Sequence, residues 1–418
     1  MKKSRWMPRR PVAKILTIGD ELLKGTVLNT NARFLGAELL RLGFKVESQV
    51  SCPDDLLSIK AEFSRALAGA ELILVTGGLG PTPDDVTRDA AADFFKVPLV
   101  LSNRQLSFIQ NYYKSRGKKM PPLVRKEALF PQNAEPLFNR YGIALGFSIA
   151  AGERLMVILP GVPDEMEKMF RELVAPLVLK KFKGLKKRLA LIVKTVGISE
   201  PGIMEKLKDD FFDDPFEFGI YPMTGEVTLR FYTDSFAVKR RLEKKAAGRL
   251  KKWIYAREET TLAAQIGKIF LREKKTLAVA ESCTGGLLAS GITAVPGASR
   301  YFKGGITAYE NKIKENWLAV PPEVLRKKGA VSPETALCMA AAVRLKMAAS
   351  IGIGITGIAG PSGGSREKPV GLVYIAIVSA NKRTVWKEIF RGTRDQIQAR
   401  AAKKAFEYLW RRAAQKQL

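Results

Sequence analysis

Ser282 lies where a short apolar stretch, residues 276–280, turns directly into a helical pattern. A serine at such a strand-to-helix elbow exposes its hydroxyl over backbone N–H groups that can stabilise an oxyanion. This arrangement suits acyl transfer, with Ser282 as nucleophile. The alternative is structural: Ser282 or Thr284 is an ordinary helix N-cap, and Gly285 and Gly286 allow close packing.

Histidine is absent from the chain, which excludes Ser-His and Cys-His catalytic systems and histidine-ligated metal sites. An active serine therefore needs another base, and a lysine with a lowered pKa is one solution. Lys314 is the candidate, with Tyr309 to relay a proton or orient the serine. The alternatives are that Lys314 is a solvated helix residue, or that Cys283 is the nucleophile, although the sequence offers that thiol no base that Ser282 lacks.

A glycine-rich loop, residues 357–365, joins two apolar stretches that we expect to be strands, residues 351–356 and 370–378. Its free N–H groups and two hydroxyls can bind a phosphate or a ribose, and Arg394 can add positive charge. The alternative is a flexible connection without a ligand.

A second glycine-rich loop, residues 76–88, follows a continuous apolar run that predicts a buried parallel strand. Three glycines let backbone N–H groups approach a phosphate: Gly77, Gly78 and Gly80. Asp84 and Asp85, at the expected helix start, can hold a divalent cation that bridges a pyrophosphate. The alternative is a tight turn in which one of these aspartates caps the helix. A further polar cluster, residues 19–21 and 29–31, follows the first predicted strand and is expected at the same sheet edge.

Strands and helices alternate in two stretches of the chain, which predicts α/β folds with parallel sheets covered by helices on both faces. Between them, residues 186–256 change to a small α+β pattern. We predict three domains: a three-layer domain over residues 1–180, a connecting domain over residues 181–258 and a second α/β domain over residues 259–418.

Lys and Arg number 70 and Asp and Glu 41, which gives a net charge of +29. Such a surface attracts polyanions, but the charges are scattered along expected helix faces without an aromatic stacking pattern, so we do not predict a specific nucleic-acid site. The sequence contains neither an apolar signal-peptide core nor a membrane-spanning run, so a cytoplasmic protein is expected. The three cysteines fit neither a disulfide framework nor a metal site.

The front of the chain resembles the molybdopterin-binding-like domain of the CinA family. The motifs that carry this resemblance are GDELLKGTVLNTNA, TGGLGPTPDDVTRDA and LPGVPDEM, within residues 12–175. Some members of that family cleave ADP-ribose with a divalent metal, and the resemblance implies that Asp20, Asp84 and Asp85 hold this metal. It further implies a substrate pocket that contains the three glycines above, together with Thr82, Asn29 and Asn31.

The back of the chain, residues 260–411, resembles the nicotinamide-nucleotide amidase domain of the same family. The motifs are AESCTGG, the spacing of Tyr309, Asn311 and Lys314, GAVS, GIAGPSGGSREKPVG and a final Gly-x-Arg. The resemblance implies cofactor-free hydrolysis of nicotinamide mononucleotide to nicotinic acid mononucleotide and ammonia, in a homodimer. Ser282 is then the nucleophile, and Tyr309 and Lys314 activate it. The implied substrate pocket contains Cys283, Thr284, Gly285, Gly286, Gly360, Gly363, Gly364, Ser365 and Arg394.

The sequence departs from the family at both ends. Ile143 and Leu145 replace a threonine and a proline, and Glu127 replaces a glutamine, which puts the front activity in doubt. At the back, Thr393 replaces an aspartate and Gln398 an arginine, which predicts weaker phosphate binding. Two other readings stay open: a basic, non-catalytic adaptor in DNA uptake or damage, and an ADP-ribose pyrophosphatase with an inactive amidase domain.

Overall fold

The structure is a computed structural model that describes residues 10–414. The chain divides into two compact units. The first extends to Leu189 and takes in Thr233–Ser235, and the second contains Ala190–Tyr232 and the residues from Phe236 onward. Each unit is described by itself, and the predicted boundaries at residues 180 and 258 stay predictions.

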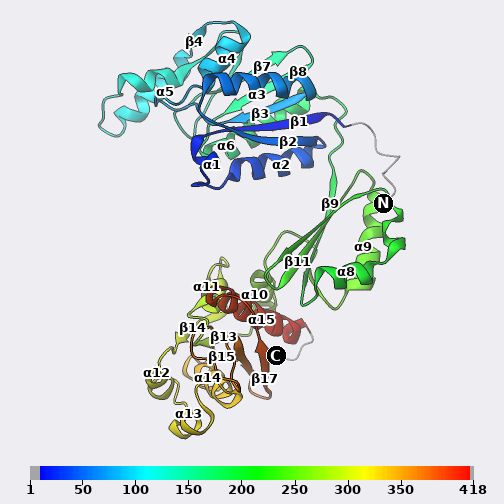
Figure 1. The fold of residues 1–418 in the computed structure, drawn as a ribbon, viewed down its shortest axis with the longest axis vertical. Coiled ribbons are helices and arrows are strands. Elements are labelled where there is room, and N and C mark those ends of the chain that lie inside the picture. The colour runs from blue at the N-terminus through cyan, green and yellow to red at the C-terminus, as the bar shows by residue number, and fades with distance from the viewer. Residues whose placement is uncertain (1–9, 415–418) are drawn as a thin grey trace. The chain divides into compact units, whose positions relative to one another are not determined.

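The first unit is built on a six-stranded sheet in the order β2-β1-β3-β8-β7-β6 (Figure 1). The strands are β1 (Val12–Ile18), β2 (Lys45–Cys52), β3 (Leu72–Thr76), β6 (Glu135–Leu137), β7 (Gly146–Ala151) and β8 (Arg154–Leu159). The first four strands of this order pair in parallel, whereas β7 pairs antiparallel with β8 and with β6. The prediction of a wholly parallel sheet was therefore wrong here. The turn between β7 and β8 is too short for the crossover that parallel strands need.

Helices cover both faces of this sheet, as three-layer packing requires. One face is covered by α2 (Thr30–Leu42), α6 (Pro163–Met169), the π-helical turn η2 (Phe170–Val174) and α7 (Ala175–Lys181). The other face is covered by α3 (Leu56–Gly69) and α4 (Thr87–Phe95). A one-turn helix, α1 (Asp20–Leu23), follows β1.

A small excursion from this unit contains β4 (Leu99–Leu101), α5 (Asn103–Lys114), the 3-10 helix η1 (Pro122–Ala128) and β5 (Leu129–Pro131). β4 and β5 pair antiparallel, and α5 packs on η1 through a small apolar cluster of its own. The sequence analysis did not identify these elements. They matter because η1 carries Glu127.

The second unit begins with a four-stranded sheet in the order β10-β11-β9-β12. Its elements are β9 (Leu189–Val196), α8 (Glu200–Leu207), the 3-10 helix η3 (Asp209–Asp213), β10 (Glu217–Met223), β11 (Glu226–Thr233), α9 (Phe236–Leu250) and β12 (Ile254–Ala256). α8 and α9 pack on the sheet through one apolar cluster. This is the predicted α+β pattern.

A five-stranded sheet in the order β14-β13-β15-β16-β17 forms the rest of the second unit. Its strands are β13 (Leu277–Glu281), β14 (Phe302–Thr307), β15 (Ile351–Gly357), β16 (Leu372–Val378) and β17 (Arg383–Ile389). β14, β13 and β15 are parallel, and β16 and β17 are antiparallel, so this sheet is also mixed and not parallel as predicted.

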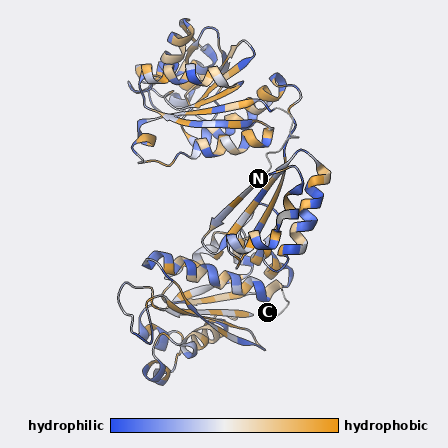
Figure 2. Ribbon diagram, turned by 45° about the vertical axis from the view of Figure 1, so that its right-hand side comes forward, coloured by the Kyte–Doolittle hydropathy of each residue, from blue (hydrophilic) through white to orange (hydrophobic). Residues whose placement is uncertain are grey.

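Helices again lie on both faces of this sheet. One layer contains α10 (Leu262–Arg272), α11 (Leu287–Thr293), the 3-10 helix η4 (Ala298–Arg300) and α15 (Arg394–Ala414). The other contains α12 (Asn311–Asn316), α13 (Pro322–Lys328) and α14 (Pro333–Lys346). Figure 2 shows hydrophobic residues concentrated on the strands and hydrophilic residues distributed along the helices. Within residues 10–414, no helix has both the length and the apolar character needed to cross a membrane.

Candidate functional site

Ser282 directly follows the inner strand β13 at its carboxyl end, as the elbow prediction requires. Its backbone N–H donates to the Ile355 carbonyl of β15 at 2.9 Å, and its own carbonyl accepts from the Gly285 N–H at 3.1 Å. Gly285 and Gly286 have φ angles of 63° and 101°, a region that favours glycine, and they complete the turn into α11. Backbone bonds on both sides therefore fix the position of the serine.

The first turn of α11 is capped by Glu281, which the sequence analysis did not single out. This buried carboxylate accepts the N–H groups of Gly286 at 3.1 Å, Leu288 at 3.0 Å and Ala289 at 2.8 Å. The alternative that Ser282 or Thr284 caps the helix was therefore wrong. The same bonds correct the predicted oxyanion donors, because these helix N–H groups are already engaged by Glu281.

Lys314 is almost fully buried, with a relative exposure of 1%. Its Nζ donates to the carbonyl oxygens of Ala308 at 2.8 Å and Tyr309 at 3.1 Å. Burial lowers the pKa of this amine from its ordinary value. The alternative of a solvated helix lysine was therefore wrong.

Ser282, Tyr309 and Lys314 all line one cavity of about 330 Å³. This is within the usual range for small-molecule sites. Of the predicted pocket residues, Cys283, Gly360, Gly363 and Arg394 line it as well. Thr284, Gly285, Gly286, Gly364 and Ser365 are not among its lining residues. Ser362, one of the two hydroxyls predicted in the glycine-rich loop, lines the cavity too. The sequence analysis missed Thr356 of β15 and did not place Ala330, in the loop before α14, at the cavity.

The rim of this cavity is organised by Arg394, the first residue of α15. Its guanidinium donates to the Gly360 carbonyl at 2.7 Å and to the Tyr309 hydroxyl. Gln398, one turn further along α15, donates to the Cys283 carbonyl at 2.7 Å. Gln398, which stands where the family has an arginine, thus anchors the backbone immediately after Ser282.

Cys283 faces the same cavity, but burial raises the pKa of its thiol to about 12. A thiol with that pKa stays protonated near neutral pH and is a poor nucleophile. The raised pKa of the thiol therefore favours Ser282 over Cys283 as nucleophile.

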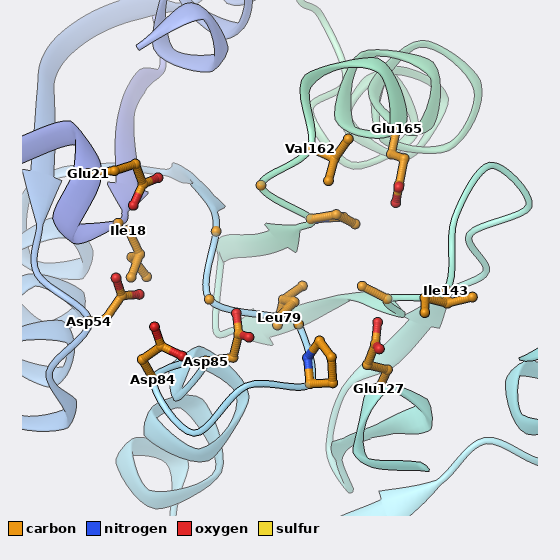
Figure 3. A pocket seen from close by; sticks show the side chains of 18 residues that line it. Ile18, Glu21, Asp54, Leu79, Asp84, Asp85, Glu127, Ile143, Val162 and Glu165 are labelled. Atoms are coloured by element: carbon orange, nitrogen blue, oxygen red, sulfur yellow. The ribbon is translucent and has the colours of Figure 1, made fainter. Parts of the chain in front are cut away.

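A second cavity, of about 410 Å³, lies in the first unit at the carboxyl ends of β1, β3 and β8. Gly77, Gly78 and Gly80 line it, as predicted for the glycine loop. A Cβ atom on Gly77 would lie 2.0 Å from the Ile18 carbonyl oxygen, so only glycine fits this close approach of two backbones. Figure 3 shows Asp84 and Asp85 on the same loop at this cavity.

The three predicted metal ligands do not come together there. Asp20 pairs with Lys24 at 2.8 Å and is not a lining residue, although Asp84 and Asp85 are. Within residues 10–414, no three His, Cys, Asp or Glu side chains are close enough to hold a metal ion. The residues as placed do not fit the metal that the resemblance implies, and metal-dependent cleavage of ADP-ribose stays a prediction.

The polar residues predicted around this cavity have mainly structural contacts. Asn29 caps α2 through Ala32 N at 2.9 Å, and Asn31 donates to the Gly161 carbonyl at 2.7 Å. Thr82 is bonded to the Asp85 carboxylate, so Asp85 closes the turn and does not cap α4, whose N-cap is Val86. None of these three predicted residues, Asn29, Asn31 or Thr82, lines the cavity.

Two of the departures from the family pattern do line it. Ile143 and Glu127 face the cavity, whereas Leu145 is buried without lining it. Asp54 and Glu165 also line it and were not singled out from the sequence. Both follow strands of the sheet, β2 and β8, and this position at the carboxyl edge was the available signal.

Comparison with known proteins identifies both parts of the chain. Residues 259–413 match the CinA C-terminal domain, and residues 14–180 match the family described as probable molybdopterin binding domain. A Moorella thermoacetica protein named as competence-damage inducible is 40% identical over 407 residues, covering 96% of this chain and 98% of the relative. The chain belongs to the CinA family.

The chain is also similar to other CinA proteins. A CinA-like protein of Kosmotoga olearia is 38% identical over 407 residues, which cover 96% of this chain and 98% of that protein. The crystal structure of CinA from Thermoplasma acidophilum is 35% identical and covers 40% of this chain and 98% of its own, with a TM-score of 0.38.

Proposed function

We propose that the cavity around Ser282 hydrolyses the carboxamide of nicotinamide mononucleotide to nicotinic acid mononucleotide and ammonia. The observation that carries this proposal is the meeting of an elbow serine, a buried lysine and a tyrosine in one cavity. The three residues come from β13 and the segment 309–314, which are separated in sequence and joined only by the fold.

The bonding of Lys314 suits a general base. A neutral amine has two N–H groups and one lone pair, and two backbone carbonyls accept from Nζ. These bonds occupy both N–H groups of the neutral form and leave its lone pair to accept a proton. The lowered pKa of Lys314 increases the share of this neutral form near pH 7.

In the proposed reaction, the Ser282 hydroxyl attacks the carboxamide carbon and its proton passes to Lys314. That proton then goes to the departing nitrogen, which leaves as ammonia. Water attacks the resulting acyl-enzyme ester, releases the carboxylic acid and returns the proton to Ser282. No metal or redox cofactor enters these steps.

The charge of the cavity supports an anionic substrate. Arg394 and Lys314 are its ionisable nitrogen groups, and none of its lining residues is Asp or Glu. Arg394 has N–H groups beyond the two bonds it makes within the protein, and a guanidinium suits a phosphate. We propose that Arg394 binds the substrate phosphate.

The test is ammonia release from nicotinamide mononucleotide by the full-length protein in the presence of EDTA. Ser282→Ala should lower the rate by at least about a thousandfold. The matched control is Ser290→Ala, because Ser290 is exposed on α11. Cys283→Ala should retain most of the activity. Absence of ammonia release from the folded wild-type protein, or full activity in Ser282→Ala, would contradict the proposal.

The basic adaptor in DNA uptake or damage stays a prediction. In α9, Arg241 pairs with Asp214 at 2.5 Å and Arg249 with Asp210 at 2.5 Å. Part of the positive charge of this helix is therefore neutralised within the protein. The homodimer and the cytoplasmic location also stay predictions.

A further inference from the structure

The cavity of the first unit has an unusual charge for a protein of +29. Figure 3 draws its eighteen lining residues, and none of them is Lys or Arg. Six are carboxylates: Glu21, Asp54, Asp84, Asp85, Glu127 and Glu165. Two nearby cationic side chains do not line the cavity and donate to backbone carbonyls, Arg88 to that of Leu79 and Lys126 to that of Thr82. The cavity therefore repels a free anion and attracts a cation.

Five of the six carboxylates form two groups on opposite sides of the cavity, and the sixth, Asp85, lies between them and accepts from the Thr82 N–H (Figure 3). Glu21, Asp54 and Asp84 lie on one side, and Glu127 and Glu165 lie on the other, where their side chains point toward one another. The first group comes from α1, the end of β2 and the glycine loop, and the second from η1 and α6.

Glu127 gives independent evidence for a ligand. It has a relative exposure of 1%, and its Oε1 has no hydrogen-bond partner among the described residues. Burying a carboxylate without a donor is costly, so such atoms are normally paired. The side chain points into the cavity, where a donor on a ligand can complete it. Burial also raises the pKa of this carboxyl to about 7.

Glu165, on the same side of the cavity, is held in position by a hydrogen bond. The Asn139 amide donates to its Oε2 at 2.7 Å, which fixes the carboxylate near the cavity. The anchored carboxylate of Glu165 and that of Glu127, whose Oε1 has no partner within residues 10–414, thus face each other, and an ammonium group can donate to both because it has three N–H donors.

The division of the carboxylates into two groups favours an organic cation over a single metal ion. A single metal ion needs several converging ligands, and residues 10–414 contain no three acidic or metal-binding side chains close enough. The apolar side chain of Leu79 lies between the two carboxylate groups, and Val162 and Ile143 line the cavity on the side of Glu165 and Glu127. Two separated positive charges joined by methylene groups match this pattern of acid, apolar wall and acid.

We propose that this cavity binds a linear aliphatic diamine or polyamine. One ammonium group lies between Glu127 and Glu165, the other against Asp54 and Asp84, and the hydrocarbon spacer covers the apolar wall. Glu127 is the residue that sets this preference, because the glutamine usual in the family carries no charge to pair with an ammonium group.

The experiment is calorimetric titration of the full-length protein with 1,4-diaminobutane at fixed ionic strength. n-Butylamine, with one charge on a similar chain, and magnesium chloride are titrated in parallel. The diamine should bind at one site per chain, at least about tenfold more tightly than n-butylamine. Glu127→Gln should weaken diamine binding by about tenfold or more.

The matched control is Glu153→Gln, which removes the same charge from an exposed turn of the first unit. It should bind the diamine as the wild type does. Asp84→Asn, at an exposed lining position, tests the opposite group and serves if Glu127→Gln does not fold. Equal affinity for the diamine and n-butylamine, unchanged diamine affinity in the lining variants, or displacement of the diamine by equimolar magnesium would overturn the proposal.

Discussion

The two cavities of this chain contrast in charge and in how their ionisable groups are held. The first has six carboxylates and no lining Lys or Arg, and the second has Lys314 and Arg394 and no lining Asp or Glu. Both lie at the carboxyl edge of a mixed sheet whose two faces are covered by helices. The same architecture thus supports one cavity that favours cationic ligands and one that favours anionic ligands.

The contrast shows that a net charge of +29 describes the outer surface and not the sites. Each cavity has a buried acid or amine side chain whose charged form is disfavoured: Glu127 in the first and Lys314 in the second. Burial raises the pKa of Glu127 and lowers that of Lys314. In Lys314 two carbonyls accept from the amine, whereas Oε1 of Glu127 has no partner within the described residues. Lys314 is thus arranged to transfer a proton and Glu127 to bind a ligand.

Replacing Lys314 should have the largest effect, and this effect is on turnover. Lys314→Met keeps the apolar stem and removes the base, so turnover of nicotinamide mononucleotide should fall by about 10²–10⁴-fold. Lys312→Met, on the exposed side of the same helix, is the matched control. Steady-state ammonia release measures both variants.

The pH profile separates a base from a merely structural lysine. Because the neutral amine is the active form, the wild-type rate should rise with pH through the lowered pKa of Lys314. The residual rate of Lys314→Met should not show this rise with pH. If Lys314→Met kept the rise of the rate with pH, or kept full turnover, the assignment of Lys314 as base would be contradicted.

Glu281 should show an intermediate effect, on stability. Glu281→Gln replaces a carboxylate that accepts three N–H groups, so the free energy of unfolding should fall by about 1–3 kcal/mol. Urea unfolding of the full chain measures this change, with exposed Glu310→Gln as control. An unchanged unfolding curve for Glu281→Gln would mean that the carboxylate does not hold the elbow.

Glu127 should show the smallest effect, and its sign depends on pH. Burial raises its pKa in the folded protein from 4.5 to about 7, despite the attraction of Arg88 and Lys126 and with repulsion from Asp85 and Glu165. The folded state therefore holds this proton more tightly than the unfolded state does. The contribution of Glu127 to stability is greatest below pH 4.5 and is lost as the pH rises to about 7.

Glu127→Gln removes that titration. The stability of the variant relative to the wild type should therefore increase by about 2 kcal/mol between pH 5 and pH 8. Urea unfolding at the two pH values measures the difference, and Glu153→Gln is again the control. A relative stability that is the same at both pH values would show that Glu127 titrates normally.

Much of the local structure could be predicted from the sequence. The apolar run before the first-unit glycine loop was found as strand β3 (Leu72–Thr76), and the α+β pattern predicted over residues 186–256 contains β9 and α8. Continuous apolar runs and helical periodicity are local signals, so tertiary context did not alter them. The direction of β7, β16 and β17 was missed, because strand pairing is set by contacts between distant segments.

The sequence by itself determined the elbow serine, the absence of histidine, the glycine loops and the family motifs, because each depends on residue type and local order. Only the tertiary structure decided that Lys314 is buried, that Glu281 and not Ser282 engages the N–H groups of α11, and that Asp20 turns to Lys24. It also brought Asp54, Glu127 and Glu165 to one cavity. Burial and pairing depend on which distant segments meet when the sheets and helices pack, and no local pattern encodes that meeting.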